Sequence, residues 1–174
     1  MPSGKNSLPR RPKKSAPSPQ ALVPADDKAG ARAAFASEAY NKVARSAQLQ
    51  LIMLESSRFF VLPEFVVDRG SEERVSNLSY SSSIDKIVFD SERGVASCEW
   101  SWSVSARTGR RKTLSVEAVY LVIYDGLTDC DSDAAGRFLR RVARFATYPY
   151  FRAHVSQKSW ESGANIPILP TIAT

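Results

Sequence analysis

Apolar and polar side chains alternate strictly over residues 95–106. Serines and Glu99 hold one parity, whereas the other is apolar throughout: Ala96, Cys98, Trp100, Trp102, Val104 and Ala106. A period of two predicts a strand with one face in a core and the other in water. Residues 114–124 are apolar and follow a short loop at 107–112 that contains Gly109. The two segments are therefore typical of a hairpin.

Two further segments, residues 48–58 and 76–89, also have strand character. In the second, one parity holds Leu78, Tyr80, Ile84 and Val88, and the serine run at 81–83 specifies strand register weakly. The stretch between them begins with the apolar run 59–67, which Pro63 breaks, and continues into a charged linker at 68–74. Proline in such a run favours a strand end or a loop.

Helices are predicted on both sides of these strands. Residues 27–47 are rich in alanine, with Phe35, Ala39 and Val43 at helical spacing. Near the end of the chain, Asp131 or Asp133 is expected to cap a helix. We expect Tyr148-Pro149 to interrupt it and a second helix to cover residues 150–161, ending at Gly163. One helix, four strands and two helices predict an α+β domain.

Composition divides the chain into two parts. Its 174 residues are 43% apolar and 24% charged, which suits one globular domain with a tail. Residues 1–25 hold six of the ten prolines and little that is large and apolar, so we expect a disordered basic tail before a domain at 26–174. No apolar run reaches the ~18 residues of a membrane helix and no secretory signal is visible, so we expect a cytoplasmic protein. Cys98 and Cys130 are then expected to be free thiols.

The positive charge is placed unevenly. The net charge is +6, of which +4 lies in residues 1–30, so the rest of the chain is nearly neutral. One row of cations stands out in the predicted helices, at spacings of i, i+3, i+4 and i+7: Arg137, Arg140, Arg141 and Arg144. Such a row is either a solvated helix face or a grip for phosphates or an acidic partner. A nucleic-acid-binding protein that uses the tail and this face is therefore an alternative function.

Residues suited to catalysis or metal binding are few. His154 is the sole histidine, and neither a phosphate-binding loop nor a nucleophile elbow is present. Asp129, Asp131 and Asp133 imitate half of a calcium loop, but Ala134 and Arg140 occupy positions that require glycine and glutamate. We therefore expect no enzyme, no metal site and no cofactor. Most aromatic residues are expected in the core, but the apolar connection at 59–67 is a candidate binding segment.

The end of the chain resembles the SecB family of export chaperones and its SecB-like relatives. Tyr148-Pro149-Tyr150-Phe151-Arg152 is similar to the family's Phe-Pro-Tyr-Ala-Arg helix start. Gly163 and the following stretch at 165–170 resemble its Gly-x-x-Pro-x-Leu-x-Leu-x-Pro segment. Upstream, residues 119–127 and the capped helix after them resemble the last strand and the first helix of the family, so that the resemblance covers about residues 48–174.

This resemblance implies a four-stranded antiparallel sheet packed by C-terminal helices, with an extra N-terminal helix, assembled as a dimer of dimers. It implies an ATP-independent holdase, with unfolded preproteins or an antitoxin as clients and the translocation motor as a further partner. Typical members are acidic whereas this chain is basic, so a toxin–antitoxin role fits at least as well as protein export. By position, the resemblance implies these client-binding residues: Phe60, Leu62, Phe65, Val66, Leu78, Tyr80, Val155 and Trp160.

Overall fold

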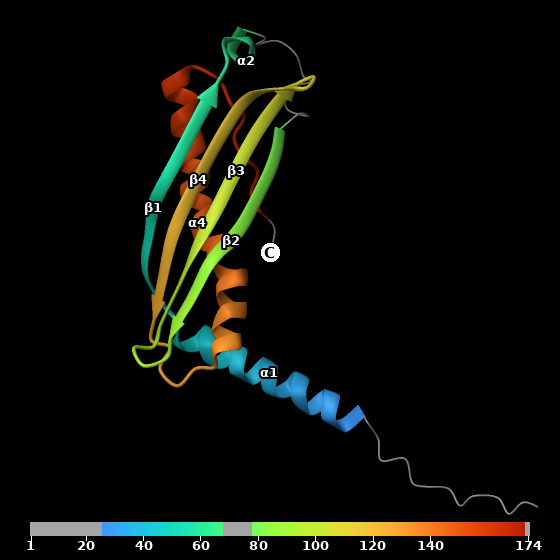
Figure 1. Cartoon of the computed structure of the whole chain (residues 1–174), viewed down its shortest axis with the longest axis vertical. Coiled ribbons are helices and arrows are strands. Elements are labelled where there is room, and N and C mark those ends of the chain that lie inside the picture. Colours follow the sequence, from blue (N-terminus) through green and yellow to red (C-terminus); the bar gives the residue numbers. More distant parts are fainter. Residues whose placement is uncertain (1–25, 68–77, 173–174) are drawn as a thin grey trace, which may run out of the picture.

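The computed structural model describes residues 26–67 and 78–172. The tail expected at 1–25 and the linker expected at 68–74 lie outside these residues. Four strands form one antiparallel sheet: β1 (Gln48–Val61), β2 (Leu78–Asp90), β3 (Val95–Thr108) and β4 (Arg111–Asp125). Their order is β1-β4-β3-β2, so β3 and β4 are central and β1 and β2 are the edges (Figure 1). The predicted α+β fold with an antiparallel sheet is confirmed.

Helices pack on one face of this sheet. The long helix α4 (Ser132–Ser162) crosses behind the strands, and α1 (Asp26–Ser46) packs against its N-terminal end and extends away from the sheet (Figure 1). Phe138 joins three elements here, because its ring lies 6.4 Å from Tyr40 of α1 and 5.1 Å from Tyr124 of β4. The short helix α2 (Pro63–Val67) follows β1. Among the described residues, no helix is long and apolar enough to cross a membrane.

The core lies between the sheet and α4. All six apolar residues of the predicted alternation in β3 are buried, and β4 adds six more on the same face. These are Leu114, Val116, Ala118, Tyr120, Val122 and Tyr124. The opposite face of β3 is half-exposed and carries its serines. The period of two therefore predicts correctly which side of the central strands faces the helix.

A single helix replaces the two that the sequence predicts at the end of the chain. Asp131 caps it, since its Oδ1 accepts a 2.8 Å hydrogen bond from the Ala134 N–H, and Gly163 ends it with φ of +64°. Pro149 lies inside the helix and cannot donate to the carbonyl four residues earlier. The helix continues because Tyr148 and Phe151, on either side of this proline, are both buried against Trp102.

Two details of the strands also differ from the predictions. Val88 does not share a face with Leu78 and Tyr80, because the register shifts between Asp85 and Val88, where Lys86 has φ of +48°. The bulge sends Val88 to the face opposite the helix, and Phe89 takes the place facing the helix. In addition, Phe60 belongs to β1 and not to the connection after it, since β1 continues to Val61.

Candidate polypeptide-binding surfaces

Several of the predicted client-binding residues gather at one end of the sheet. One row of paired residues crosses all four strands: Val61, Leu114, Ala106 and Leu78. This row places α2 and the start of β2 at the same end of the sheet. The helix α2 closes this end: the Leu62 N–H donates to the Thr113 carbonyl and the Phe65 N–H to the Leu62 carbonyl, both at 2.9 Å. Leu62, Val66 and Leu78 are half-buried there.

The remaining predicted residues differ in how accessible they are. Phe60, Tyr80 and Trp160 are exposed by 45%, 49% and 86%, so all three can meet another molecule. Phe65 and Val155 are buried in the core and offer no surface in this conformation. A direct role in binding stays a prediction for all eight residues. The exposed three come from β1, β2 and the end of α4.

A groove lies between β2, α4 and the C-terminal segment, by which we mean residues 164–172. It holds about 260 Å³. Tyr80 and two serines of β2 form one wall, Arg144 and Tyr148 of α4 form the other, and Pro170 and Ile172 close one side. Trp102 and Phe151 line its floor. We call this the β2 groove.

Aromatic contacts and hydrogen bonds connect the residues at the floor of the β2 groove. The rings of Trp102 and Phe151 stack at 5.6 Å with an interplanar angle of 13°, and Tyr148 lies 5.1 Å from Trp102. The Trp102 indole N–H donates a 2.9 Å hydrogen bond to the Thr147 hydroxyl, which itself donates to the Ala143 carbonyl at 2.8 Å. A preformed apolar floor lowers the ordering cost of binding.

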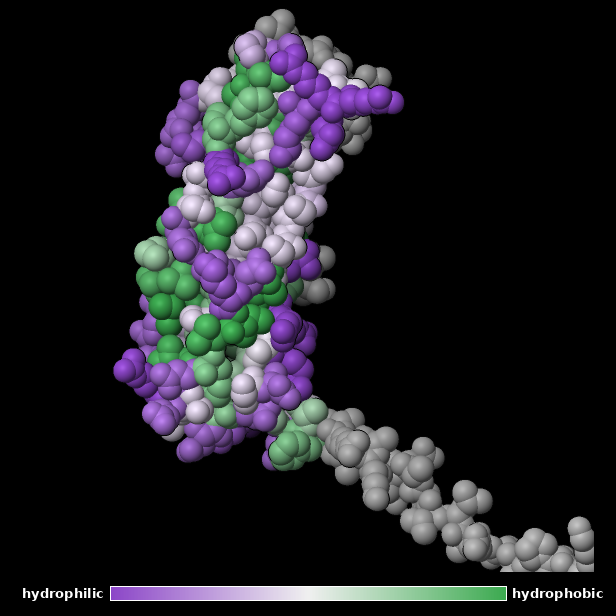
Figure 2. All heavy atoms as spheres, in the orientation of Figure 1, coloured by the Kyte–Doolittle hydropathy of each residue, from purple (hydrophilic) through white to green (hydrophobic). Residues whose placement is uncertain are grey.

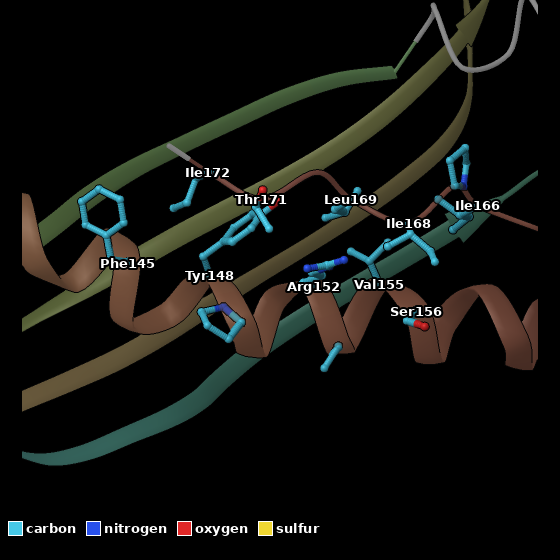
Figure 3. Close-up of a pocket in the computed structure, with 13 residues that line it drawn as sticks. Phe145, Tyr148, Arg152, Val155, Ser156, Ile166, Ile168, Leu169, Thr171 and Ile172 are labelled. Atoms are coloured by element: carbon cyan, nitrogen blue, oxygen red, sulfur yellow. The ribbon is translucent and has the colours of Figure 1, made fainter. Parts of the chain in front are cut away.

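The C-terminal segment separates the β2 groove from a second cavity. Ile166 and Leu169 of this segment are buried, and the Tyr148 hydroxyl donates to the Pro170 carbonyl. On its other side lies a cavity of about 610 Å³, which Tyr148, Arg152 and Val155 of α4 line together with the apolar residues of the segment (Figure 3). Tyr148 and Ile172 line both spaces. The segment thus contributes residues to two neighbouring cavities along α4.

The face of the sheet opposite α4 carries another apolar surface. Leu51 and Met53 of β1 are exposed there, and they pair with the half-buried Ile123 and Leu121 of β4. Figure 2 shows apolar atoms gathered over one part of this face and atoms of nearly neutral hydropathy over another part. No described helix covers it. Apolar patches of this kind commonly mark protein contacts.

Two tyrosines at the β2 groove keep their protons at physiological pH. Burial raises the pKa of Tyr80, and burial is also the main reason why the pKa of Tyr148 is raised, although Arg152 opposes that shift. Both phenols are therefore neutral hydrogen-bond donors. Arg144 is the charged group that lines this groove. Such a surface can bind a polypeptide by apolar contact and hydrogen bonds.

Sequence reasoning missed part of this surface. Trp102 was expected in the core, whereas Tyr148 and Phe151 were noted only as part of the motif that resembles SecB. All three are buried, and they also line the β2 groove. Pro170 and Ile172 were not singled out for binding. Two sequence features could have pointed to these residues: the motif at 148–152 and the proline-containing end of the chain. Neither indicates a groove by itself, because the groove forms only where the two segments lie next to β2.

Comparison with known proteins shows a SecB-like fold. No protein-family model and no curated protein matches the chain. Among solved structures, it is similar to a SecB-like chaperone of Mycobacterium tuberculosis in complex with a ChAD peptide from the HigA1 antitoxin, with a TM-score of 0.58 and 15% identity over 79% of this chain and 96% of that one. A protein of unknown function from Streptococcus agalactiae reaches a TM-score of 0.34 and 7% identity over 73% and 97% of the two chains.

Proposed function

We propose that this protein is an ATP-independent molecular chaperone, a holdase that binds non-native polypeptide segments. The observation that carries the proposal is Tyr80, which is half-exposed above the aromatic floor of the β2 groove, on an edge strand. The peptide complex of the structurally similar M. tuberculosis chaperone supports a polypeptide client. Nucleotide, metal and cofactor are not part of the proposal, and it assigns no enzymatic activity to the chain.

The physical basis is a sum of weak, unspecific contacts. Each client aromatic or aliphatic side chain buried in the groove contributes ~2 kcal/mol. The outer edge of β2 is unpaired among the described strands, so an extended client can add backbone hydrogen bonds that do not depend on its sequence. Phe60 and Trp160 supply further apolar contacts at the end of the molecule that carries α2 and the end of α4 (Figure 1).

We favour an antitoxin as the client over a preprotein destined for export. The similar chaperone was solved with an antitoxin peptide, which supports this class of client. Typical members of the family use their acidic character to dock the translocation motor. This chain has a net charge of +6 instead, which disfavours the same docking. We place the protein in the cytoplasm, where such clients are synthesised.

We also propose a homo-oligomer, a dimer of dimers. The edge strand β1 spans 14 residues and leaves apolar side chains exposed on both of its faces: Leu51 and Met53 on one, Leu49 and Leu54 on the other. Long apolar edge strands pair readily with another chain. Changing Leu51 and Met53 to Lys should convert the assembly to smaller species in light scattering, and a monomeric wild-type protein would contradict the proposal.

The test of chaperone activity is suppression of client aggregation. A variant with Phe60→Ser, Tyr80→Ser and Trp160→Ser should fold normally and lose most of the suppression, because three exposed apolar contacts are gone. Phe35→Ser is the matched control, since Phe35 is 70% exposed but lies on α1, away from the groove. Equal suppression by the triple variant and the wild type would refute the proposal. Binding that falls steeply with salt and ignores these changes would favour the nucleic-acid alternative.

A further inference from the structure

One stripe of α4 changes character halfway along the helix. Positions 137, 141, 144, 148, 151 and 155 follow one another at spacings of four and three, so they lie on the same side of the helix. The first three are arginines and the last three are Tyr148, Phe151 and Val155. Arg140 lies beside the first three. A stripe that begins cationic thus continues as an apolar one.

Burial changes at the same point. All four arginines are exposed, whereas Tyr148, Phe151 and Val155 are buried. The reason is the path of α4, whose C-terminal part packs on the sheet while its first turns meet α1 beyond the strands (Figure 1). Arg144 stands at the transition, because it lines the β2 groove together with Tyr80 and Tyr148. The arginines therefore continue the line of the groove over ~10 Å of helix.

These guanidinium groups are available to another molecule. Among the described residues, none of the four forms an ion pair, and Arg137 donates one long hydrogen bond of 3.4 Å to the Ala36 carbonyl. The walls of the β2 groove contain serines and no carboxylate. A bound segment that leaves the groove along α4 would meet unpaired positive charge.

We infer that the β2 groove selects client segments in which an apolar anchor is flanked by aspartate or glutamate. This inference rests on the proposed function and names the class of client. The aromatic floor holds the anchor, and the client's carboxylates pair with the arginines next to it. Bidentate pairing of guanidinium with carboxylate adds directional hydrogen bonds to the charge attraction. Exposed ion pairs are individually weak, so we expect the four together to give a preference of about tenfold over a neutral flank.

The test uses three labelled peptides that share one Phe- and Leu-containing core and carry Glu, Gln or Lys flanks at both ends. The full-length wild-type protein should bind the Glu peptide about tenfold more tightly than the Gln peptide at low salt, and the Lys peptide most weakly. The preference should shrink in 0.5 M salt. Arg140→Gln with Arg141→Gln should reduce the preference to about threefold and leave the affinity for the Gln peptide unchanged.

The matched control removes two charges elsewhere. Arg107→Gln with Arg110→Gln changes the exposed β3–β4 turn and should keep the full preference. Equal affinity of wild type for the Glu and Gln peptides overturns the inference, and so does a preference that the two α4 substitutions leave intact. If a single-stranded oligonucleotide binds the wild type tightly and the α4 variant weakly while the wild type binds the Glu and Gln peptides equally, the row is a nucleic-acid surface and the inference fails. If none of the three peptides binds, the proposed function itself fails.

Discussion

The central and edge strands of this sheet place their apolar side chains differently. In β3 and β4, the apolar residues that face α4 are all buried. In β1 and β2, Leu49, Leu54 and Tyr80 lie on the same face of the sheet but remain exposed, although these strands are of similar length. An edge strand has one sheet neighbour, and α4 covers the middle of the sheet (Figure 1). The comparison teaches that the buried core lies at the centre of the sheet and that the accessible apolar side chains lie at its edges.

The strongest test of this division uses two tryptophans. Trp102→Ala should destabilise the protein by about 3–5 kcal/mol, because a buried ring that contacts Tyr148, Phe151 and Trp100 is removed. Trp160→Ala should change the free energy of unfolding by less than about 0.5 kcal/mol, since this side chain is almost fully exposed. Urea unfolding measures both. Similar losses for the two variants would remove the distinction between core and surface.

Cysteine reactivity sharpens the comparison further. Burial raises the pKa of Cys98 in β3 to about 12, so about one in 10⁴ of its side chains is a thiolate at pH 8. Cys130 lies outside the sheet and is half-buried. Alkylation of the native protein should modify Cys130 at least about 100-fold faster than Cys98, and both should react alike in denaturant. Rapid native labelling of Cys98 would mean that the centre opens readily.

Thr147 tests the polar contact inside the aromatic floor. Thr147→Val keeps the volume of the side chain but leaves the Trp102 indole N–H without its acceptor. We expect a loss of about 1–3 kcal/mol, because an unsatisfied buried donor keeps its desolvation cost. Thr128→Val, at an exposed position, is the control and should be nearly neutral. An unchanged urea midpoint for Thr147→Val would show that this hydrogen bond contributes nothing measurable to stability.

The smallest expected effect concerns pH. Burial holds the pKa of His154 below its usual value, and Lys158 lowers it further while Glu161 opposes both. The folded state therefore binds this proton less readily than the unfolded state. The stabilising contribution is present above the unfolded pKa of ~6.5 and is lost as pH falls from there through the folded pKa. His154→Gln should flatten the dependence of unfolding free energy on pH between 7 and 5. The prediction would be contradicted if the wild type became more stable relative to His154→Gln as the pH falls from 7 to 5.

Local pattern predicted most of the elements of this fold. The alternation of β3, the alanine-rich α1 and the caps Asp131 and Gly163 are all confirmed, since each depends on residues close together in the chain. The prediction of two helices was wrong. Pro149 costs the helix one backbone hydrogen bond, but the burial of its neighbours Tyr148 and Phe151 outweighs that loss. Val88 was assigned to the wrong face because a bulge at a non-glycine residue leaves no signal in the hydrophobic pattern.

The candidate binding surfaces depended more strongly on long-range packing. Sequence reasoning selected Tyr80 and Trp160, which are exposed, but also Phe65 and Val155, which are buried. All four are large apolar or aromatic side chains, and their contacts in space separate the exposed pair from the buried pair. The floor of the β2 groove combines Trp102 with Tyr148 and Phe151, more than 40 residues away along the chain.

By itself, the sequence determined most of the secondary structure, the buried face of the hairpin and the row of arginines, because periodicity and capping act between neighbours along the chain. Tertiary structure decided which apolar residues remain accessible and that the arginine row leads into an aromatic groove. Both depend on where α4 crosses the sheet and on how the C-terminal segment lies beside it. Contacts between distant segments set that geometry, and no local pattern encodes it.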